Sequence, residues 1–311
     1  MKRNRSFKLI MAALSLGLLM GCSQDPASVD LDTDEDAIRF LVEENEDYLT
    51  TAGINDDGAQ PWVYSIDGFG KTSDLITPLR FGRRGTFRLE HFSVDRVGDS
   101  LAVATIIKSF NGKFFILAED STDSVAQGKL YAKYMENEIV KKAIFKKVGN
   151  HENRRKNWKL KRVSGTEAKS PETTLSFEYI TVQNSDGQEW TIEDPLQFIL
   201  DLEAIPRLQH RDTVKVFVEI SNSAPYVNNP GETVLLRYRN DRRMHRARKG
   251  LNDDGVFPDE TAGDGIYSGY WLVGQRRGLY HAFVDAIDNG TIYDDLLPYN
   301  SLVWGFPYIV K

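Results

Sequence analysis

The side chains best suited to bind a cation lie in one acidic stretch, residues 252–265 (NDDGVFPDETAGDG). It holds Asp253, Asp254, Asp259 and Asp264, with glycines between them. Calcium takes about 6–8 oxygen ligands, and a loop punctuated by glycines can fold carboxylates inward around the ion. One interpretation of this stretch is therefore a calcium site with these four aspartates as its ligands. Their spacing differs from that of an EF-hand loop, because the second ligand position is shifted and no glutamate closes the loop.

The same residue types have a second interpretation, which is turn formation. Aspartate side chains accept hydrogen bonds from nearby backbone amides, and glycine adopts positive φ at no steric cost. This interpretation is favoured for loop 252–265 and for a second acidic group within residues 285–295. The basic run 237–249 could bind phosphate or an acidic glycan, since arginine matches such anions. The favoured interpretation is that the run forms a surface hairpin, and that its arginines form ion pairs with the acidic loop.

Five histidines are scattered along the chain, at positions 91, 151, 210, 245 and 281. No two have the spacing of zinc ligands, and the chain contains no Gly-x-Ser-x-Gly nucleophile motif. His91 lies on a predicted strand, residues 87–97, and is the only one of the five positioned to point into a pocket of the N-terminal half. The sequence offers no partner for His91, so we predict no catalytic residues and a protein that is not an enzyme.

The chain begins with a short export signal. Four basic residues within positions 2–8 precede an apolar run over 9–20, too short for a permanent membrane helix, which needs about 20 residues. Gly21 and Cys22 follow, and residues 1–22 resemble a bacterial lipoprotein signal peptide, with Met20 departing from the residue usual at its position. The resemblance implies cleavage before Cys22 and attachment of fatty acids such as palmitate to Cys22. It also implies a lipid-anchored extracytoplasmic protein, and Ser23 favours the outer membrane in an organism that has one.

Composition supports this location and excludes several functions. Cys22 is the only cysteine, so the mature protein has no thiol for a disulfide, a metal site or thiolate catalysis. Loss of residues 1–21 removes four basic residues and no acid, which changes the formal net charge from −6 to −10. So acidic a chain is not a general nucleic-acid binder. The expected partners are the membrane, through the lipid, and envelope proteins or glycans.

Residues 33–165 predict a helix followed by an antiparallel sheet. Thr33 begins a stretch with capping-box spacing, and apolar residues recur at helical spacing as far as Leu49. Strands are predicted over 87–97, 101–110, 113–117, 139–148 and 158–163. Asn111-Gly112 predicts a two-residue hairpin turn. The helix, the strand VGDSLAVATII and the last strand, led by Trp158, resemble the nuclear-transport-factor-two-like (SnoaL-like, cystatin-like) fold. That resemblance implies an α+β cone-like domain with a curved sheet around a pocket.

Residues 166–173 (TEAKSPET) have linker composition, and the chain after them shows short strands separated by turns. The segments Tyr238-Arg239, Asp253-Asp254-Gly255, Gly263 to Tyr267 and Asp285 to Asp288 resemble an immunoglobulin-like module of bacterial surface proteins. The resemblance implies an all-β immunoglobulin-like sandwich that serves as a spacer or adhesive element. The expected order is signal peptide 1–21, lipidated tether 22–32, cone-like domain 33–165, linker 166–173 and sandwich 174–311.

These observations predict a lipid-anchored binding or scaffolding protein without catalytic activity. Its first domain would recognise a small apolar ligand or a partner. Two alternatives stay open. One is an enzyme whose cone pocket uses His91 as general base, and the other is a purely structural component of the cell envelope. Resemblance of fold does not choose among them, because function depends on the site.

Overall fold

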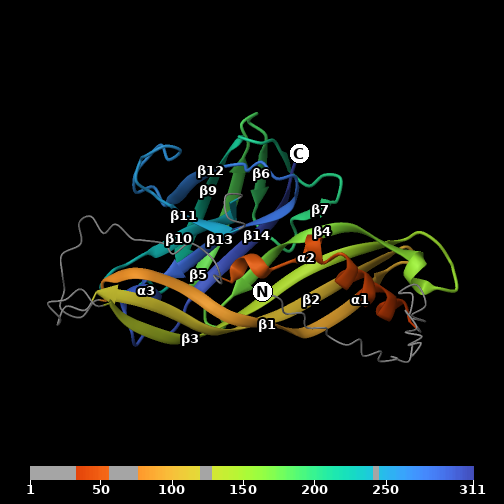
Figure 1. Cartoon of the computed structure of the whole chain (residues 1–311), viewed down its shortest axis with the longest axis horizontal. Helices are drawn as coiled ribbons and strands as arrows, with labels where there is room; N and C mark the ends of the chain where they lie inside the picture. The colour runs from red at the N-terminus through yellow and green to blue at the C-terminus, as the bar shows by residue number, and fades with distance from the viewer. Residues whose placement is uncertain (1–32, 56–75, 120–127, 241–244) are drawn as a thin grey trace, which may run out of the picture. The chain divides into compact units, whose positions relative to one another are not determined.

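Strands dominate the computed structural model, which describes residues 33–55, 76–119, 128–240 and 245–311. The three longest are β1 (Pro78–Val97), β2 (Leu101–Glu119) and β3 (Gly128–Lys147), which pair as antiparallel neighbours (Figure 1). Residues 31–311 form one compact unit. None of the helices in the described ranges is long and apolar enough to cross a membrane. Cys22 and the tether lie outside the described residues.

Two sheets make up this unit. The larger has ten strands in the order β1-β2-β3-β4-β14-β13-β10-β11, with β7 paired to β4 and β8 to β14, and the smaller has the order β12-β9-β5-β6. The other strands are β4 (Trp158–Lys169), β5 (Leu175–Gln183), β6 (Glu189–Ile192), β7 (Ile199–Asp201), β8 (Arg207–Leu208), β9 (Thr213–Asn222), β10 (Glu232–Asn240), β11 (His245–Leu251), β12 (Ile266–Leu272), β13 (Gly278–Asp288) and β14 (Ser301–Val310). The helices are α1 (Asp34–Glu44), α2 (Glu46–Leu49) and α3 (Asn289–Tyr293), with 3-10 turns η2 (Ala52–Ile54) and η3 (Arg154–Asn157).

The large sheet corrects the predicted fold class. The prediction of an α+β cone-like domain followed by a separate sandwich is wrong, because the structure is mostly β and one sheet runs through both halves. β4 continues to Lys169, through the first residues of the predicted linker, and pairs with β14 as well as with β3. Thr166 and Ala168 are each at most 1% exposed there, so a segment of linker composition is buried between two strands. Composition alone did not reveal this alternation of buried positions.

β2 corrects a predicted turn. Asn111-Gly112 lies inside β2, where Asn111 pairs with Thr86 and Gly112 with Gly85. A Cβ atom at Gly112 would lie 2.1 Å from the backbone oxygen of Arg84. Gly112 therefore allows β1 and β2 to approach closely, and the chain does not reverse at this dipeptide.

The inner face of the large sheet is concave. Four strands separate β1 from β13, which in a flat sheet with a spacing near 4.8 Å would place them about 24 Å apart. Yet the guanidinium of Arg83 on β1 donates to both carboxylate oxygens of Asp285 on β13, at 2.6 and 2.7 Å. The sheet must therefore curl until side chains from its two halves meet.

Apolar side chains form three cores around this sheet. The first lies between the two sheets and includes Val216 and Trp304, so the C-terminal half is a β-sandwich. The second lies on the concave face and includes Phe283. The third lies further along the same face, where Ile38 of α1 packs in a cluster with Phe145 of β3. Strands β13 and β14 contribute to cores on both of their faces, which explains why almost every residue in them is buried.

α1 begins where the sequence predicts. Thr33 Oγ1 accepts a hydrogen bond from the backbone amide of Asp36 at 3.1 Å, as a helix N-cap does. Ion pairs then join the ends of the helix to the sheet region: Asp34 binds Arg96, and Glu44 binds Arg155. These contacts position α2 and η2, which follow α1, over the concave face.

Candidate functional site

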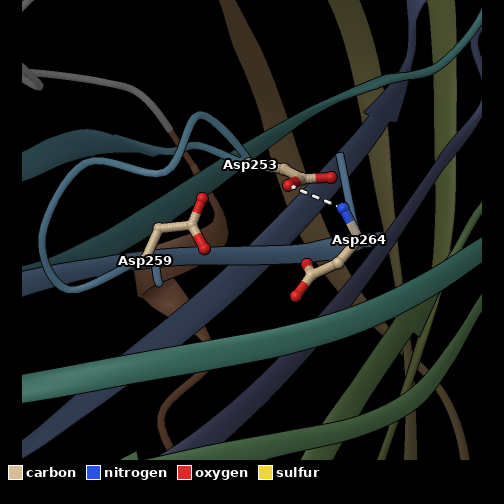
Figure 2. Close-up of side chains that lie close together, drawn as sticks. All are labelled: Asp253, Asp259 and Asp264. Carbon is tan, nitrogen blue, oxygen red and sulfur yellow. Dashed lines mark hydrogen bonds between the residues drawn. The ribbon is translucent and has the colours of Figure 1, made fainter. Parts of the chain in front are cut away.

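The acidic loop connects β11 to β12. Asp253, Asp259 and Asp264 each offer a carboxylate oxygen, and these three oxygens lie within 4.8 Å of one another (Figure 2). Asp254, the fourth predicted ligand, is not part of this group. Its carboxylate accepts from the amide of Val256 at 3.0 Å and from the side chain of Asn252 at 3.0 Å. The structure thus brings together three of the four predicted ligands.

Backbone amides already bind these carboxylates. Asp253 accepts from the amides of Gly263, Asp264 and Gly265 at 2.6, 3.2 and 2.9 Å. Asp259 accepts from the amide of Gly255 at 2.6 Å, and this hydrogen bond lowers the pKa of the Asp259 carboxyl. The glycines supply the backbone conformation that these bonds need, since Gly263 and Gly265 have φ of 75° and 85°. The aspartates therefore fold the loop, and the fold brings three carboxylates close together.

The second acidic group serves local structure. Asp288 accepts from the amide of Gly290 at 2.8 Å and from the side chain of Asn222 at 2.8 Å. Asp294 accepts from the amide of Leu296 at 2.8 Å, which is the pattern of an aspartate in a turn. Asp285 is fully buried in ion pairs with arginines. Turn and core roles account for these three acids.

The basic run 237–249 forms β10 and β11, and residues 241–244 of it lie outside the described part. Arg237 is 2% exposed and binds Asp285. Arg248 donates to the backbone oxygen of Phe81 at 2.8 Å, and Lys249 lies 3.6 Å from the ring centroid of Tyr270. These three side chains are bound by other parts of the chain, so they contribute neither an anion-binding patch nor the predicted pairing with the acidic loop.

Among the described residues, His91 is exposed on the surface and lines neither of the cavities found there. A β-bulge between Leu89 and His91 shifts the register of β1 against β2, and the side chain of His91 is exposed. The prediction that it faces the interior of the first domain is therefore wrong. In a regular strand, alternate side chains point to opposite faces of the sheet, so the sequence position predicts the face. A bulge inserts one extra residue, and every side chain after it then points to the face opposite to the predicted one.

A different histidine lines a cavity on the concave face. The cavity has a volume of about 310 Å³ and lies between the segment α2–η2 and strands β10 and β13. Its walls are largely apolar and aromatic, with a few polar groups. They comprise Asp47, Thr50, Ala52, Gly53, Arg237, Tyr238, Leu279, Tyr280, His281 and Phe283. This volume lies at the small end of the range for ligand sites, and the mixture of walls is typical of them.

His281 joins the two sides of this cavity. Its Nε2 lies 3.0 Å from the backbone oxygen of Asp47. A carbonyl oxygen only accepts hydrogen bonds, so Nε2 carries the proton in the neutral ring. Burial, reinforced by the nearby charge of Lys141, lowers the pKa of His281 well below its usual value. The ring is therefore neutral at physiological pH.

Lys141 lies on β3, on the same concave face. It is 1% exposed, and burial together with the like charge of Lys108 lowers the pKa of Lys141 to about 7. The sequence contained a signal for this position. Buried residues of β3 alternate at odd numbers, including Met135, Ile139 and Ala143, and Lys141 falls in the same phase. A lysine at a position where the strand alternation calls for an apolar residue indicates a buried amino group. The many charged residues around Lys141 in this segment made that signal hard to recognise in the sequence.

Comparisons with known proteins identify no family. No family model matches the chain, and no curated protein matches it. Among solved structures, one of Extended-Synaptotagmin 2 that comprises its SMP domain and two C2 domains is similar at 7% identity. The match covers 88% of this chain and 96% of that chain, with a TM-score of 0.15. A likeness this weak carries no argument, so proposals about function depend on the geometry described above.

Proposed function

We propose that this protein is a lipid-anchored extracytoplasmic binding protein whose ligand site is the cavity between α2–η2 and the concave face. The observation that carries the proposal is the cavity itself, with an apolar wall formed by Leu279 and Phe283 and polar groups at His281 and Arg237. Such a wall suits a small, mainly apolar ligand held in one orientation by a few polar contacts. The C-terminal sandwich, which resembles immunoglobulin-like modules, acts as a spacer or adhesive element.

The binding proposal can be tested by filling the cavity. Ala52 is half-buried in its wall, so Ala52→Phe should place a ring in the cavity. We expect native mass spectrometry of the protein purified from membranes to reveal a small molecule that is lost in Ala52→Phe. Ala132→Phe, on an exposed part of β3, is the control and should retain it. Equal occupancy in both variants, or none in the unchanged protein, would count against the cavity as the ligand site.

The anchoring proposal has its own test. Cys22 is the only residue that could carry the lipid of a lipoprotein. We expect the protein to sediment with membranes and to incorporate a palmitate analogue, and Cys22→Ser to lose the label. Retention of the label in Cys22→Ser would refute acylation at this cysteine.

A second candidate function, calcium binding, is favoured by the convergence of Asp253, Asp259 and Asp264. Calcium that binds only the folded state stabilises it by about 2.7 kcal/mol at 100 times the dissociation constant. We expect calcium to raise the melting temperature relative to chelator. Asp253→Asn retains an oxygen for the loop amides but loses the charge, and should abolish the rise. Asp254→Asn, outside the converging group, should retain it. Superimposable melts in calcium and chelator would mean that the loop is only a turn.

A further inference from the structure

The convex face of the large sheet carries a group of apolar side chains at one end of β2 and β3. Phe114 is fully buried in the concave core, so its neighbour Phe115, and Leu117 two positions further on, point to the convex face. Leu130 and Tyr134 lie on the same face of β3 and are 63% and 68% exposed. Neighbouring apolar side chains that meet water in this way mark a site of interaction with a partner or a membrane.

Two exposed cations border these side chains. Arg80 on β1 pairs with Leu117, which in turn pairs with Leu130, and Lys113 on β2 pairs with Tyr134. The Cβ atoms of side chains paired in this way on one face of a sheet lie about 5 Å apart. Cationic and apolar groups therefore form one continuous surface, which we call the convex patch. It consists of Arg80, Lys113, Phe115, Leu117, Leu130 and Tyr134.

The convex patch is positively charged, although the chain as a whole is acidic with a formal net charge of −6. Arg84 lies exposed on the same face of β1 but has an interaction within the chain, so the charge is counted from Arg80 and Lys113 alone. The nearest acidic positions of the same face on these paired strands, Glu119 and Glu136, lie at the two ends of the patch. The patch therefore suits an anionic partner.

We propose that the convex patch binds the surface of a membrane that contains anionic lipids. Its cations attract the headgroup phosphates, and its apolar side chains enter the boundary between headgroups and acyl chains, where tyrosine is also favoured. An acidic protein would need the cations alone, and a second copy of this chain would bring like charges together. The choice of a membrane rests on the proposed lipid anchor, but the patch itself requires no lipid on Cys22.

This contact would orient the molecule. The tether of residues 22–32 leads into α1, whose first residue, Asp34, binds Arg96 at the far end of β1. Arg96 and Arg80 lie about 50 Å apart along this strand. Attachment near both ends of β1 would lay the large sheet along the bilayer with its convex face toward the lipids. The concave face, with the cavity, would then be turned away from the membrane.

The test uses vesicles and an unlipidated protein. The chain from Ser23 to Lys311 contains the whole compact unit and lacks Cys22. We expect it to sediment with vesicles of phosphatidylcholine and phosphatidylglycerol at least about tenfold more tightly than with phosphatidylcholine alone, since each cation near an anionic surface contributes roughly fivefold. Replacing both cations, Arg80→Gln with Lys113→Gln, should weaken binding to the anionic vesicles about 25-fold. The control is Lys156→Gln with Arg207→Gln, which removes the same charge from exposed positions outside the patch and should have little effect.

A second pair of variants tests the apolar contribution. Leu130→Ser should weaken binding to the anionic vesicles severalfold, because this side chain would leave water for the lipid boundary. Leu272→Ser is the control, since Leu272 is 60% exposed on β12, outside the patch. Exposed positions tolerate such changes, so the variants should unfold at the same urea concentration as the unchanged chain.

The results that would overturn the proposal are distinct. Equal binding to both kinds of vesicle, no binding, or undiminished binding after loss of Arg80 and Lys113 would each exclude a role of the patch at an anionic membrane. If loss of the cations weakens binding but Leu130→Ser does not, the patch attracts polyanions in general, such as an acidic protein. A dimer that Leu130→Ser dissociates would assign the patch to a second copy. None of these results bears on palmitate labelling of Cys22 or on ligand binding in the cavity, so the proposed function stands or fails separately.

Discussion

Asp285 is the residue on which the buried polar network of the concave face depends. It is fully buried and accepts hydrogen bonds from Arg83 and Arg237. Burial by itself raises the pKa of the Asp285 carboxyl, but the charges of Arg237 and Arg83 outweigh burial and lower it. Tyr299 extends the network, because its hydroxyl lies 2.6 Å from Arg83 Nε. The sequence did not predict this network, since Arg83 and Asp285 are 202 positions apart and meet only because the sheet curls.

Removing the charge of Asp285 should destabilise the protein strongly. Asp285→Asn leaves two guanidinium groups buried around a neutral amide, and breaking a buried ion pair typically costs about 3–5 kcal/mol. We expect a loss of that size in the free energy of unfolding measured with urea. The control is Asp201→Asn, which removes an ion pair with Arg162 whose side chains are 58% and 49% exposed. That change should cost less than about 1 kcal/mol. Equal effects of the two substitutions would contradict the buried network.

Lys141 should make stability depend on pH in the alkaline range. Its pKa is about 7 in the folded protein against 10.5 for an ordinary lysine, so between these values the unfolded chain holds a proton that the folded protein lacks. Stability therefore rises as the pH increases from about 7 to 10. Lys141→Met removes this contribution. Since one pKa unit corresponds to about 1.4 kcal/mol, the variant should be more stable than the unchanged protein by at least about 1 kcal/mol at pH 7.

The measurement is urea unfolding of the unchanged protein and of Lys141→Met at pH 6–10. All other titrating groups are the same in the two proteins, so they affect both free energies of unfolding equally. Their difference should shrink as the pH rises. Parallel profiles for the unchanged protein and Lys141→Met would show that Lys141 is not the buried base.

At the scale of elements, the sequence predicted strands better than it predicted what joins them. The predicted strand over 175–183 coincides with β5, and the predicted helix starts at its capping residue, Thr33. Both depend on signals within a few residues. The turn at Asn111-Gly112 is wrong because a dipeptide that favours a hairpin also suits a strand where another backbone approaches. Pairing between β4 and β14 joins residues about 135 positions apart, which no local pattern records.

Gly112 offers a test of the close approach between β1 and β2. In Gly112→Ala the new methyl group would overlap the backbone oxygen of Arg84, which lies 2.1 Å from the position of the Cβ atom. Backbone cannot move aside as a flexible side chain can, so we expect a loss of about 1–3 kcal/mol in stability. Lys113→Ala, at the exposed neighbouring position, should change stability by no more than about 0.5 kcal/mol. An undiminished melting temperature in Gly112→Ala would contradict the continuous strand.

At the scale of the whole molecule, the important feature is that cores on both faces share the same strands. Trp304 on β14 belongs to the core between the sheets, and Val303 beside it belongs to a core of the concave face. If a strand that is buried on both faces detaches from one core, the apolar side chains of the other core become exposed to water as well. The predicted separation into two domains supposed two independent cores, and composition gave no indication that they share strands.

This sharing predicts one cooperative unfolding transition. Trp158 lies in the core beneath α1, and Trp271 lies in the core between the sheets. Fluorescence from chains that retain one or the other tryptophan should lose its native signal at the same urea concentration, because the two cores unfold together. In each of these two proteins, every tryptophan except the reporter is changed to phenylalanine. The two proteins then differ only in which core the reporter lies in, so each is the control for the other. Midpoints that differ clearly would show that the halves unfold separately.

The position of β14 has a consequence for how the protein is made. β14 comes last in sequence among the described strands, yet it lies in the middle of the large sheet, between β4 and β13. In a chain synthesised from its N-terminus, β1 to β4 are made long before β14 is. Until then β4 has an unpaired edge, which favours association with other chains. Folding of this protein should therefore depend on factors that shield this edge, and the demand should increase when translation slows over residues 170–300.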